Sequence, residues 1–344
     1  MIQRTVGNGI QLMPVVKADA YRHGATAVSQ VLEHEGAQWL AVSNIEEGKA
    51  LREAGLRAGI LVMADHVDTD MRAWKEFRLT PVVHDLNEIK MLGPDTAYHL
   101  EIDSGMARLG TNAPTQVIID AVRGTRLEGL MTHFASSANF QSDQTEKQHA
   151  RFESIRQALE QSGVRPTYLH EASTNPLHFS DTKTWRNLVR PGYAIYGFVS
   201  RASGKPAGEI LNVSPALSWK AKILLVKHVE AGTPIGYGAQ FVADKPMRIG
   251  IIGLGYADGL PHRLGNRGKV IAGGKLANIL GAVSMDVSTV DLTHAPGLEA
   301  GDAITLLGQE GDVSIDARDM ARDAGTIAYS ILCGISTRVA RIYV

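Results

Sequence analysis

The sequence predicts an α/β fold, an N-terminal (β/α)8 TIM barrel followed by a mostly β C-terminal domain. In the first half of the chain, short apolar runs bounded by turn residues recur eight times, and segments with apolar residues at helical spacing separate most of them. In the second half, the pattern changes to β-rich runs with frequent glycine. Alternating strands and helices build a parallel sheet, and eight such strands can close into a barrel.

The eight apolar runs are the predicted barrel strands. They lie at residues 12–16, 39–42, 59–63, 81–83, 98–102, 127–131, 167–170 and 188–196. Residues 27–32 and 152–159 are two of the intervening segments, and each places apolar side chains on one face of a helix. We therefore assign residues 1–200 to the barrel.

The C-terminal part of the chain predicts a second domain. Residues 200–210, which include Ser203-Gly204-Lys205-Pro206, are typical of a linker. Strands are expected at residues 221–229, 247–252, 270–271, 277–280, 287–290 and 303–307, and one helix near residues 315–324. We assign residues 208–344 to this mostly β domain.

Composition excludes several classes of protein. With 44% hydrophobic residues, the 344-residue chain can bury a large core, and its net charge of −1 gives no general attraction for nucleic acid. Residues 1–14 do not resemble a signal peptide, and no run approaches the roughly 18 apolar residues that cross a bilayer. The single cysteine, Cys333, fits a reducing compartment and is interpreted as a small buried hydrophobe. We predict a cytoplasmic protein that binds neither nucleic acid nor membrane.

Residues whose side chains can take part in catalysis or binding follow the predicted barrel strands. Enzymes of this fold place their active sites there. Lys17 follows the first strand, His133 the sixth, and Ser173-Thr174 the seventh, while Arg190-Pro191-Gly192-Tyr193 lies in the eighth. A lysine that ends a buried strand is desolvated, which lowers its pKa and favours Schiff-base chemistry. Hydroxyls and bare amides after the last two strands can hold a phosphate.

A lysine beside a phosphate cradle indicates a phosphorylated aldehyde cofactor. Two other interpretations remain for these residues alone: Lys17 can be a surface lysine, and the small residues can simply form tight turns. No histidine pair has metal-ligand spacing and there is no cysteine cluster, so we predict no metal site.

Several motifs together carry a family resemblance. Val15-Val16-Lys17-Ala18-Asp19-Ala20-Tyr21-Arg22-His23-Gly24 resembles the cofactor-lysine signature of alanine racemases. Further matches follow in the family's order: Asp103 to Gly110, Thr132 to Ala135, Val189 to Gly197, Gly236-Tyr237-Gly238, Gly255-Tyr256-Ala257-Asp258-Gly259 and Met285-Asp286. The resemblance covers nearly the whole chain.

The resemblance implies a racemase that uses pyridoxal 5'-phosphate and supplies D-alanine for peptidoglycan. It implies a homodimer in which the β domain of each subunit completes the active site of its partner. Lys17 would carry the cofactor, and Tyr256 of the other subunit would be the opposing base. The other residues, by matched position, are Tyr21, Ser173, Thr174, Gly192, Tyr193 and Tyr329 for the phosphate, Arg190 for the pyridine nitrogen, His133 against the ring, Arg108 and the Met285 amide for the substrate carboxylate, and Tyr237 at the entrance.

The chemistry of racemisation requires two acid–base groups, as the resemblance implies. Racemisation removes the α-proton from one face of a flat carbanion and returns a proton to the other, so acid–base groups are needed on opposite sides. Tyr256 needs positive neighbours to act as a base, and Arg190 through His133 can supply them. An arginine facing the pyridine nitrogen keeps its own proton, which weakens the electron sink and limits side reactions.

The sequence also departs from the family's pattern. Glu101 occupies a position where the family often has a modified lysine, and we expect its carboxylate to orient Arg108. The usual Asn-Ser of the phosphate cradle is Ser173-Thr174, and Lys17 is reached unusually early. A helix that helps to close the barrel is therefore expected to be replaced, for example by residues 200–210.

Two alternative functions are retained. One is a racemase for serine or for several amino acids, although Tyr237 and Tyr329 are expected to narrow the entrance and favour alanine. The other is a non-catalytic barrel protein that only carries pyridoxal phosphate. Proteins of that class end after the barrel, so residues 208–344 argue against it.

Overall fold

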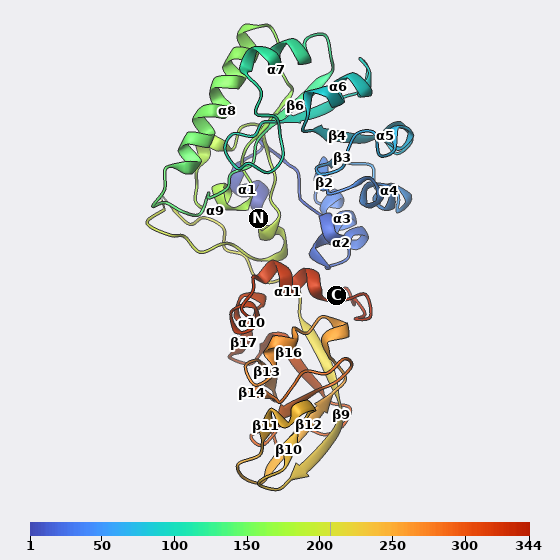
Figure 1. Cartoon of the computed structure of the whole chain (residues 1–344), viewed down its shortest axis with the longest axis vertical. Coiled ribbons are helices and arrows are strands. Elements are labelled where there is room, and N and C mark those ends of the chain that lie inside the picture. The colour runs from blue at the N-terminus through green and yellow to red at the C-terminus, as the bar shows by residue number, and fades with distance from the viewer. Residues whose placement is uncertain (207) are drawn as a thin grey trace. The chain divides into compact units, whose positions relative to one another are not determined.

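The structure is a computed structural model that describes residues 1–206 and 208–344, so residue 207 of the predicted linker lies outside the described residues. Contacts divide the chain into two compact units (Figure 1). The barrel unit consists of Met1–Ala20 and Gly24–Ser214, and the β unit consists of Tyr21–His23 and Pro215–Val344. Each unit is described below by itself.

Eight parallel strands form the barrel, as the sequence predicts. They are β1 (Gln11–Leu12), β2 (Trp39–Val42), β3 (Gly59–Val62), β4 (Leu79–Val83), β5 (Tyr98–Glu101), β6 (Leu127–Met131), β7 (Tyr168–His170) and β8 (Leu188–Val189). Strands β2 to β7 pair in chain order, and β1 pairs with β8. Backbone hydrogen bonds close the ring on both sides of this pair. Val16 N donates to Ala41 O (2.8 Å) and Ala41 N donates to Pro14 O (2.9 Å), while Arg190 N donates to Ala172 O (2.9 Å).

Helices surround the strands, and Figure 1 shows α4 to α8 on their outer side. The helices of this part of the chain are α1 (Ile2–Val6), α2 (Lys17–Tyr21), α3 (Ala25–His34), α4 (Ile45–Glu53), α5 (Met71–Glu76), α6 (Leu86–Leu92), α7 (Thr115–Val122), α8 (Gln144–Gln161) and α9 (Thr174–His178), with the 3-10 turns η1 (Thr182–Thr184) and η2 (Tyr193–Tyr196). Side chains of Asn44, Asp70 and Asp85 cap α4, α5 and α6 by accepting bonds from first-turn N–H groups. No described helix is both long and apolar enough to cross a membrane.

The flank of the barrel beside β1 and β8 is covered without a regular eighth helix. Among the described residues, only the short turn η2 stands between β8 and the first strand of the β unit. A regular eighth helix is therefore absent among the described residues, as expected, but residues 200–210, which we suggested as its replacement, supply no side chain to the cluster there. Ile2 and Val6 of α1 instead pack against Trp185 and Val189, and Leu211, directly after the predicted linker, joins the same cluster.

Aromatic rings fill the interior of the barrel. The ring of His99 lies 5.5 Å from that of Trp39, 5.8 Å from Tyr168 and 4.9 Å from His170, measured between centroids. Gly129 on β6 makes room for this cluster, because a Cβ atom there would lie 2.5 Å from Cγ of His99. Glycine at this inward position is therefore a requirement of the packing.

The β unit contains a closed antiparallel sheet. Its elements are β9 (Trp219–Val229), β10 (Pro234–Ile235), η3 (Tyr237–Ala239), β11 (Phe241–Val242), β12 (Met247–Ile252), η4 (Tyr256–Asp258), η5 (His262–Leu264), β13 (Lys269–Ala272), β14 (Lys275–Leu280), β15 (Ser288–Asp291), β16 (Ala303–Glu310), β17 (Val313–Ile315), α10 (Ala317–Ala324) and α11 (Ala328–Gly334). The strand order is β13-β14-β15-β12-β9-β16-β17, and an additional pair between β13 and β16 closes the ring. The predicted helix corresponds to α10, whereas α11, which contains Cys333, was not predicted from the sequence.

Replacing Gly129 by alanine should destabilise the barrel. The added methyl group meets the His99 ring, which cannot move away because its Nδ1 lies 2.8 Å from Nε2 of His170. Overpacking of this kind costs about 1–3 kcal/mol, and each kcal/mol lowers the melting temperature of such a domain by roughly 2–4 °C. Gly9→Ala is the matched control, because nothing lies within 4 Å of a Cβ atom there. Equal melting temperatures for the two variants in thermal unfolding would contradict the prediction.

Candidate active site

Lys17 begins a left-handed turn. The four residues after it, Ala18 to Tyr21, and then Arg22, all have φ between 51° and 64°. This conformation costs an L-residue roughly 1–2 kcal/mol, so the turn needs outside support. The carboxylate of Glu47 accepts a bond from Ala18 N (2.7 Å), and that of Asp19 accepts one from Ala25 N (2.7 Å). These bonds fix the backbone at the predicted cofactor lysine.

Arg190, after β8, is buried and surrounded by hydrogen-bond acceptors. Its Nη1 donates to the carbonyl oxygen (2.7 Å) and to Nδ1 (2.8 Å) of His170. Its Nη2 donates to the carbonyl oxygen of Thr132 (2.7 Å) and lies 3.4 Å from Nδ1 of His133. Burial lowers the pKa of Arg190 to about 10, which still leaves the guanidinium charged at neutral pH.

Arg190 determines the tautomers of two buried histidines. Because arginine only donates, Nδ1 of His170 must accept, and Nε2 of His170 then donates to Nδ1 of His99 at 2.8 Å. Burial, followed by the charge of Arg190, lowers the pKa of His99 to about 3 and that of His170 well below its usual value. Both rings are therefore neutral. Sequence reasoning did not select these residues; the only available signal was their inward position on β5 and β7.

His133 lies among three cations. Loss of solvent, followed by the charges of Arg190, Arg108 and Lys17, lowers its pKa to about 3. The barrel unit thus brings Lys17, Arg108, His133 and Arg190 into one electrostatic environment. A neutral imidazole there leaves the positive charge on the lysine and the arginines.

The predicted phosphate cradle is organised by one hydroxyl. Oγ1 of Thr174 accepts bonds from Gly192 N and Ala194 N, both at 3.2 Å. Tyr193 is buried, and Ser173 immediately precedes the short helix α9. The hydroxyl and the backbone amides therefore lie together at the ends of β7 and β8, where barrel enzymes bind phosphate.

The loop that carries Arg108 is shaped by Asp103. Oδ1 of Asp103 accepts bonds from the N–H groups of Gly105, Met106 and Ala107, each at 3.0 Å. Partial burial raises the pKa of Asp103, but these three bonds and the charge of Arg151 outweigh it and the net pKa is lowered. Arg108 follows directly and is exposed in this chain.

Glu101 does not form the ion pair that we expected. Among the described residues, its carboxylate and the guanidinium of Arg108 lie farther apart than 4.0 Å. Oε2 of Glu101 instead lies 3.1 Å from Nδ1 of His84, whose Nε2 lies 3.0 Å from the carbonyl oxygen of Met63. The prediction of direct orientation by Glu101 is therefore wrong.

The β unit brings a second group of predicted residues together. Tyr237, Tyr256 and Met285 line one pocket of about 560 Å³, and His262, which sequence reasoning missed, lies there with its ring 6.2 Å from that of Tyr256. Tyr21 and Tyr329 form a separate pair with ring centroids 5.8 Å apart. Burial raises the pKa of Tyr329 to about 12 and also raises that of Tyr21, so both phenols stay protonated.

Comparisons with known proteins agree over the whole chain. Residues 1–200 match the family described as "Alanine racemase, N-terminal domain", and residues 216–343 match "Alanine racemase, C-terminal domain". A protein named alanine racemase from Halothermothrix orenii is 35% identical, over 99% of this chain and 92% of that protein. The chain belongs to the alanine racemase family. It is therefore an isomerase that acts as an amino-acid racemase.

Solved structures of alanine racemases have the same fold. The enzyme from Streptomyces coelicolor A3(2) superposes with a TM-score of 0.91 at 31% identity, covering 100% of this chain and 94% of that one. The enzyme from Bacillus anthracis, solved with bound L-Ala-P, gives a TM-score of 0.89 at 29% identity, covering 98% of this chain and 89% of that one. The family's two-part architecture is thus retained here.

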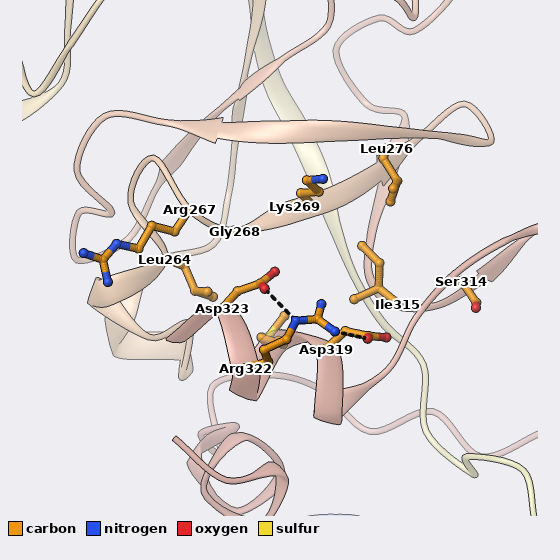
Figure 2. Close-up of a pocket in the computed structure, with 11 residues that line it drawn as sticks. Leu264, Arg267, Gly268, Lys269, Leu276, Ser314, Ile315, Asp319, Arg322 and Asp323 are labelled. Atoms are coloured by element: carbon orange, nitrogen blue, oxygen red, sulfur yellow. Dashed lines mark hydrogen bonds and ion pairs between the residues drawn. The ribbon is translucent and has the colours of Figure 1, made fainter. Parts of the chain in front are cut away.

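Another hollow of this racemase, of about 260 Å³, lies on the β unit between β13 and α10 (Figure 2). None of the predicted site residues lines it. Arg322 bridges Asp319 and Asp323 there, at 3.1 Å and 3.2 Å. Because the side chains of Arg267 and Lys269 point in different directions (Figure 2), its basic groups do not converge on a common ligand position.

The neutral histidine His99 should make the racemase less stable in acid. An unfolded chain binds a proton at His99 near pH 6.5, whereas the folded chain does so only near pH 3, so stability falls as the pH is lowered from 6.5 towards 3. One histidine contributes up to about 1.4 kcal/mol per pH unit. We expect His99→Gln, whose amide can still accept from His170, to reduce the pH slope of the urea unfolding free energy. The same slope in this variant and in a variant of the exposed His228 would refute the assignment.

Proposed function

We propose that the chain interconverts L- and D-alanine with pyridoxal 5'-phosphate as cofactor, using Lys17 and the partner subunit's Tyr256 as two bases. The observation that carries the proposal is the buried Arg190, with two neutral histidines behind it and the charges of Lys17 and Arg108 near His133. The Bacillus anthracis relative binds L-Ala-P, which is consistent with an alanine substrate.

The residues present fit this cofactor. Arg190 is a permanent donor that suits an unprotonated pyridine nitrogen, and Lys17 supplies the amine for covalent attachment. Thr174, Gly192 and Tyr193, with Ser173, Tyr21 and Tyr329, would hold the phosphate. When bound, the cofactor supplies the electron sink that makes the α-proton of an amino acid acidic.

The protein's own residues would move the proton. Lys17 takes the α-proton of D-alanine at its Nζ, and Tyr256 takes that of L-alanine at its phenolic oxygen, which requires the two groups on opposite faces of the substrate. Neutral His133 would lie against the cofactor's ring, and its low pKa would prevent it from competing for the proton.

The substrate carboxylate would bind between Arg108 and the backbone N–H of Met285. The loop that Asp103 holds presents Arg108 for this contact. Tyr237, which is 77% exposed in the single chain, would narrow the entrance and limit side-chain size. These residues make alanine the preferred substrate within the proposal.

The proposal includes a homodimer. Residues 1–200 form the cofactor-binding barrel, and residues 208–344 complete the partner's site with Tyr256, Tyr237 and Met285. A closed two-fold dimer gives two such composite sites. In the cell, the cytoplasmic product D-alanine would serve peptidoglycan synthesis.

Replacing Tyr256 by phenylalanine should affect the two enantiomers unequally. The ring shape is retained and the acidic oxygen is lost, so deuterium exchange at Cα of L-alanine should fall by roughly 10²–10⁴-fold. Exchange into D-alanine, which uses Lys17, should persist. Tyr343→Phe, at an exposed tyrosine of the same unit, is the control. Near-normal exchange of both enantiomers by Tyr256→Phe would show that Tyr256 is not a base.

Two inactive variants should complement each other if the site is shared between subunits. Lys17→Ala removes one base from the barrel, and Tyr256→Phe removes the other from the β domain. After subunits are exchanged at equal amounts, half of the dimers are mixed and each has one intact site, which gives about a quarter of wild-type racemisation. Chiral chromatography of alanine measures this recovery. Failure to recover activity, with mixed dimers verified by mass spectrometry, would place both bases in one chain.

A further inference from the structure

We propose that Arg338 is a positioning residue for the second base, because it joins the turn that carries Tyr256 to the loop that carries Met285. The inference rests on the proposed function, since it takes Tyr256 as a base and Met285 as a substrate contact. It concerns only residues of the β unit, and it assigns a role to a side chain that no motif singled out.

The turn that carries Tyr256 is held by the carboxylate of Asp258. Oδ2 of Asp258 accepts a bond from Gly255 N at 2.9 Å, so the carboxylate closes the 3-10 turn η4 onto itself. The carbonyl oxygen of Asp258 accepts a bond from Ser336 N at 3.0 Å. Asp258 is 8% exposed, and its geometry therefore sets that of the neighbouring Tyr256.

The same turn lies directly against the backbone of the Met285 loop. Tyr256 N donates to Ser284 O and Ala257 N donates to Met285 O, both at 3.0 Å. A Cβ atom on Gly255 would lie 2.2 Å from Ser284 O and 2.3 Å from Met285 O, so only glycine permits this approach. A small shift of either segment therefore changes the position of both Tyr256 and Met285.

Arg338 bridges the acidic side chains of these two segments. Its Nη2 donates to Oδ1 of Asp286 at 2.8 Å, and its Nε lies 3.4 Å from Oδ1 of Asp258. Asp258 is two residues after Tyr256, and Asp286 is one residue after Met285. Without the guanidinium, two carboxylates would repel each other across the contact between the segments.

The segment that carries Arg338 is itself fixed. Arg341 donates to the carbonyl oxygens of Ser336 (3.0 Å) and Ile335 (3.1 Å), and also to that of Arg22 (2.8 Å). Arg338 N donates to Oγ of Ser336 at 3.2 Å. The guanidinium therefore extends from a supported backbone, and its contacts can transmit a defined geometry.

The purely structural alternative makes a different prediction. Arg338 is half exposed, and exposed ion pairs contribute little to stability. If Arg338 only stabilised the fold, its loss would affect both enantiomers equally. If it positions Tyr256, its loss affects the reaction that uses Tyr256 more strongly than the reaction that uses Lys17.

The experiment compares deuterium exchange at Cα of each alanine enantiomer in the cofactor-loaded dimer. For Arg338→Ala we expect exchange of L-alanine to fall by about tenfold or more, because small misplacements of a catalytic group are costly. Exchange of D-alanine should stay within about twofold of wild type, and the melting temperature should change by only about 2 °C. Arg338→Lys keeps the charge but lacks the fork that reaches two carboxylates, so it should recover only part of the loss.

Arg322→Ala is the matched control, because Arg322 also bridges two aspartates of the β unit but lies at the other pocket (Figure 2). It should leave both exchange rates unchanged. Suppose that Tyr256→Phe is selective for L-alanine. The inference is then overturned if Arg338→Ala and Arg338→Lys slow the exchange of both enantiomers equally, or slow neither. If Tyr256→Phe is not selective either, the two-base proposal itself fails.

Discussion

The need to satisfy a buried guanidinium organises the centre of the barrel. Arg190 is 2% exposed, and removing an arginine from water costs several kcal/mol unless its donors are paired. Its partners lie at the ends of β6 and β7. They are the carbonyl oxygens of Thr132, His170 and Glu171 and the ring nitrogens of His170 and His133. Arg190 N also closes the barrel by bonding to Ala172 O. One residue therefore joins the fold to the site.

The same constraint reaches deep into the interior. Because Arg190 cannot accept a proton, His170 and then His99 take a single tautomer, and both are neutral. His99 fits only because Gly129 lies opposite it on β6. The site is positive at Lys17, Arg108 and Arg190 and neutral at the histidines. This charge distribution thus depends on Gly129, which contacts His99 and not Arg190 itself.

Much of this architecture was predictable because it depends on local pattern. Apolar runs bounded by turns indicated the barrel strands, and the order of the motifs indicated the family. β1 and β8 are shorter than predicted, since Val15 pairs with Ala41 only in an isolated bridge and Arg190 bonds to Ala172 outside a regular strand pair. Helix α11 escaped prediction because it has seven residues and no side-chain cap.

Other features depend on contacts between distant residues and leave no signal in the sequence. The sequence Ala18-Asp19-Ala20-Tyr21 does not by itself predict a left-handed turn, whose backbone is held by bonds from Ala18 N to Glu47 and from Ala25 N to Asp19. The pairing of Glu101 with His84 rather than Arg108 and the bridge from Arg338 to two aspartates also require the folded chain. The residue types in the motifs predicted the reacting groups, whereas the contacts that hold those groups in place could be seen only in the folded structure.

The hydroxyl of Thr174 has a consequence for how the protein matures. It already accepts bonds from the N–H groups of Gly192 and Ala194, so these two donors are satisfied in the folded chain without a phosphate. A phosphate that enters exchanges one acceptor for another instead of rescuing an incomplete structure. The native arrangement of these two amides would then not depend on whether the phosphate is bound.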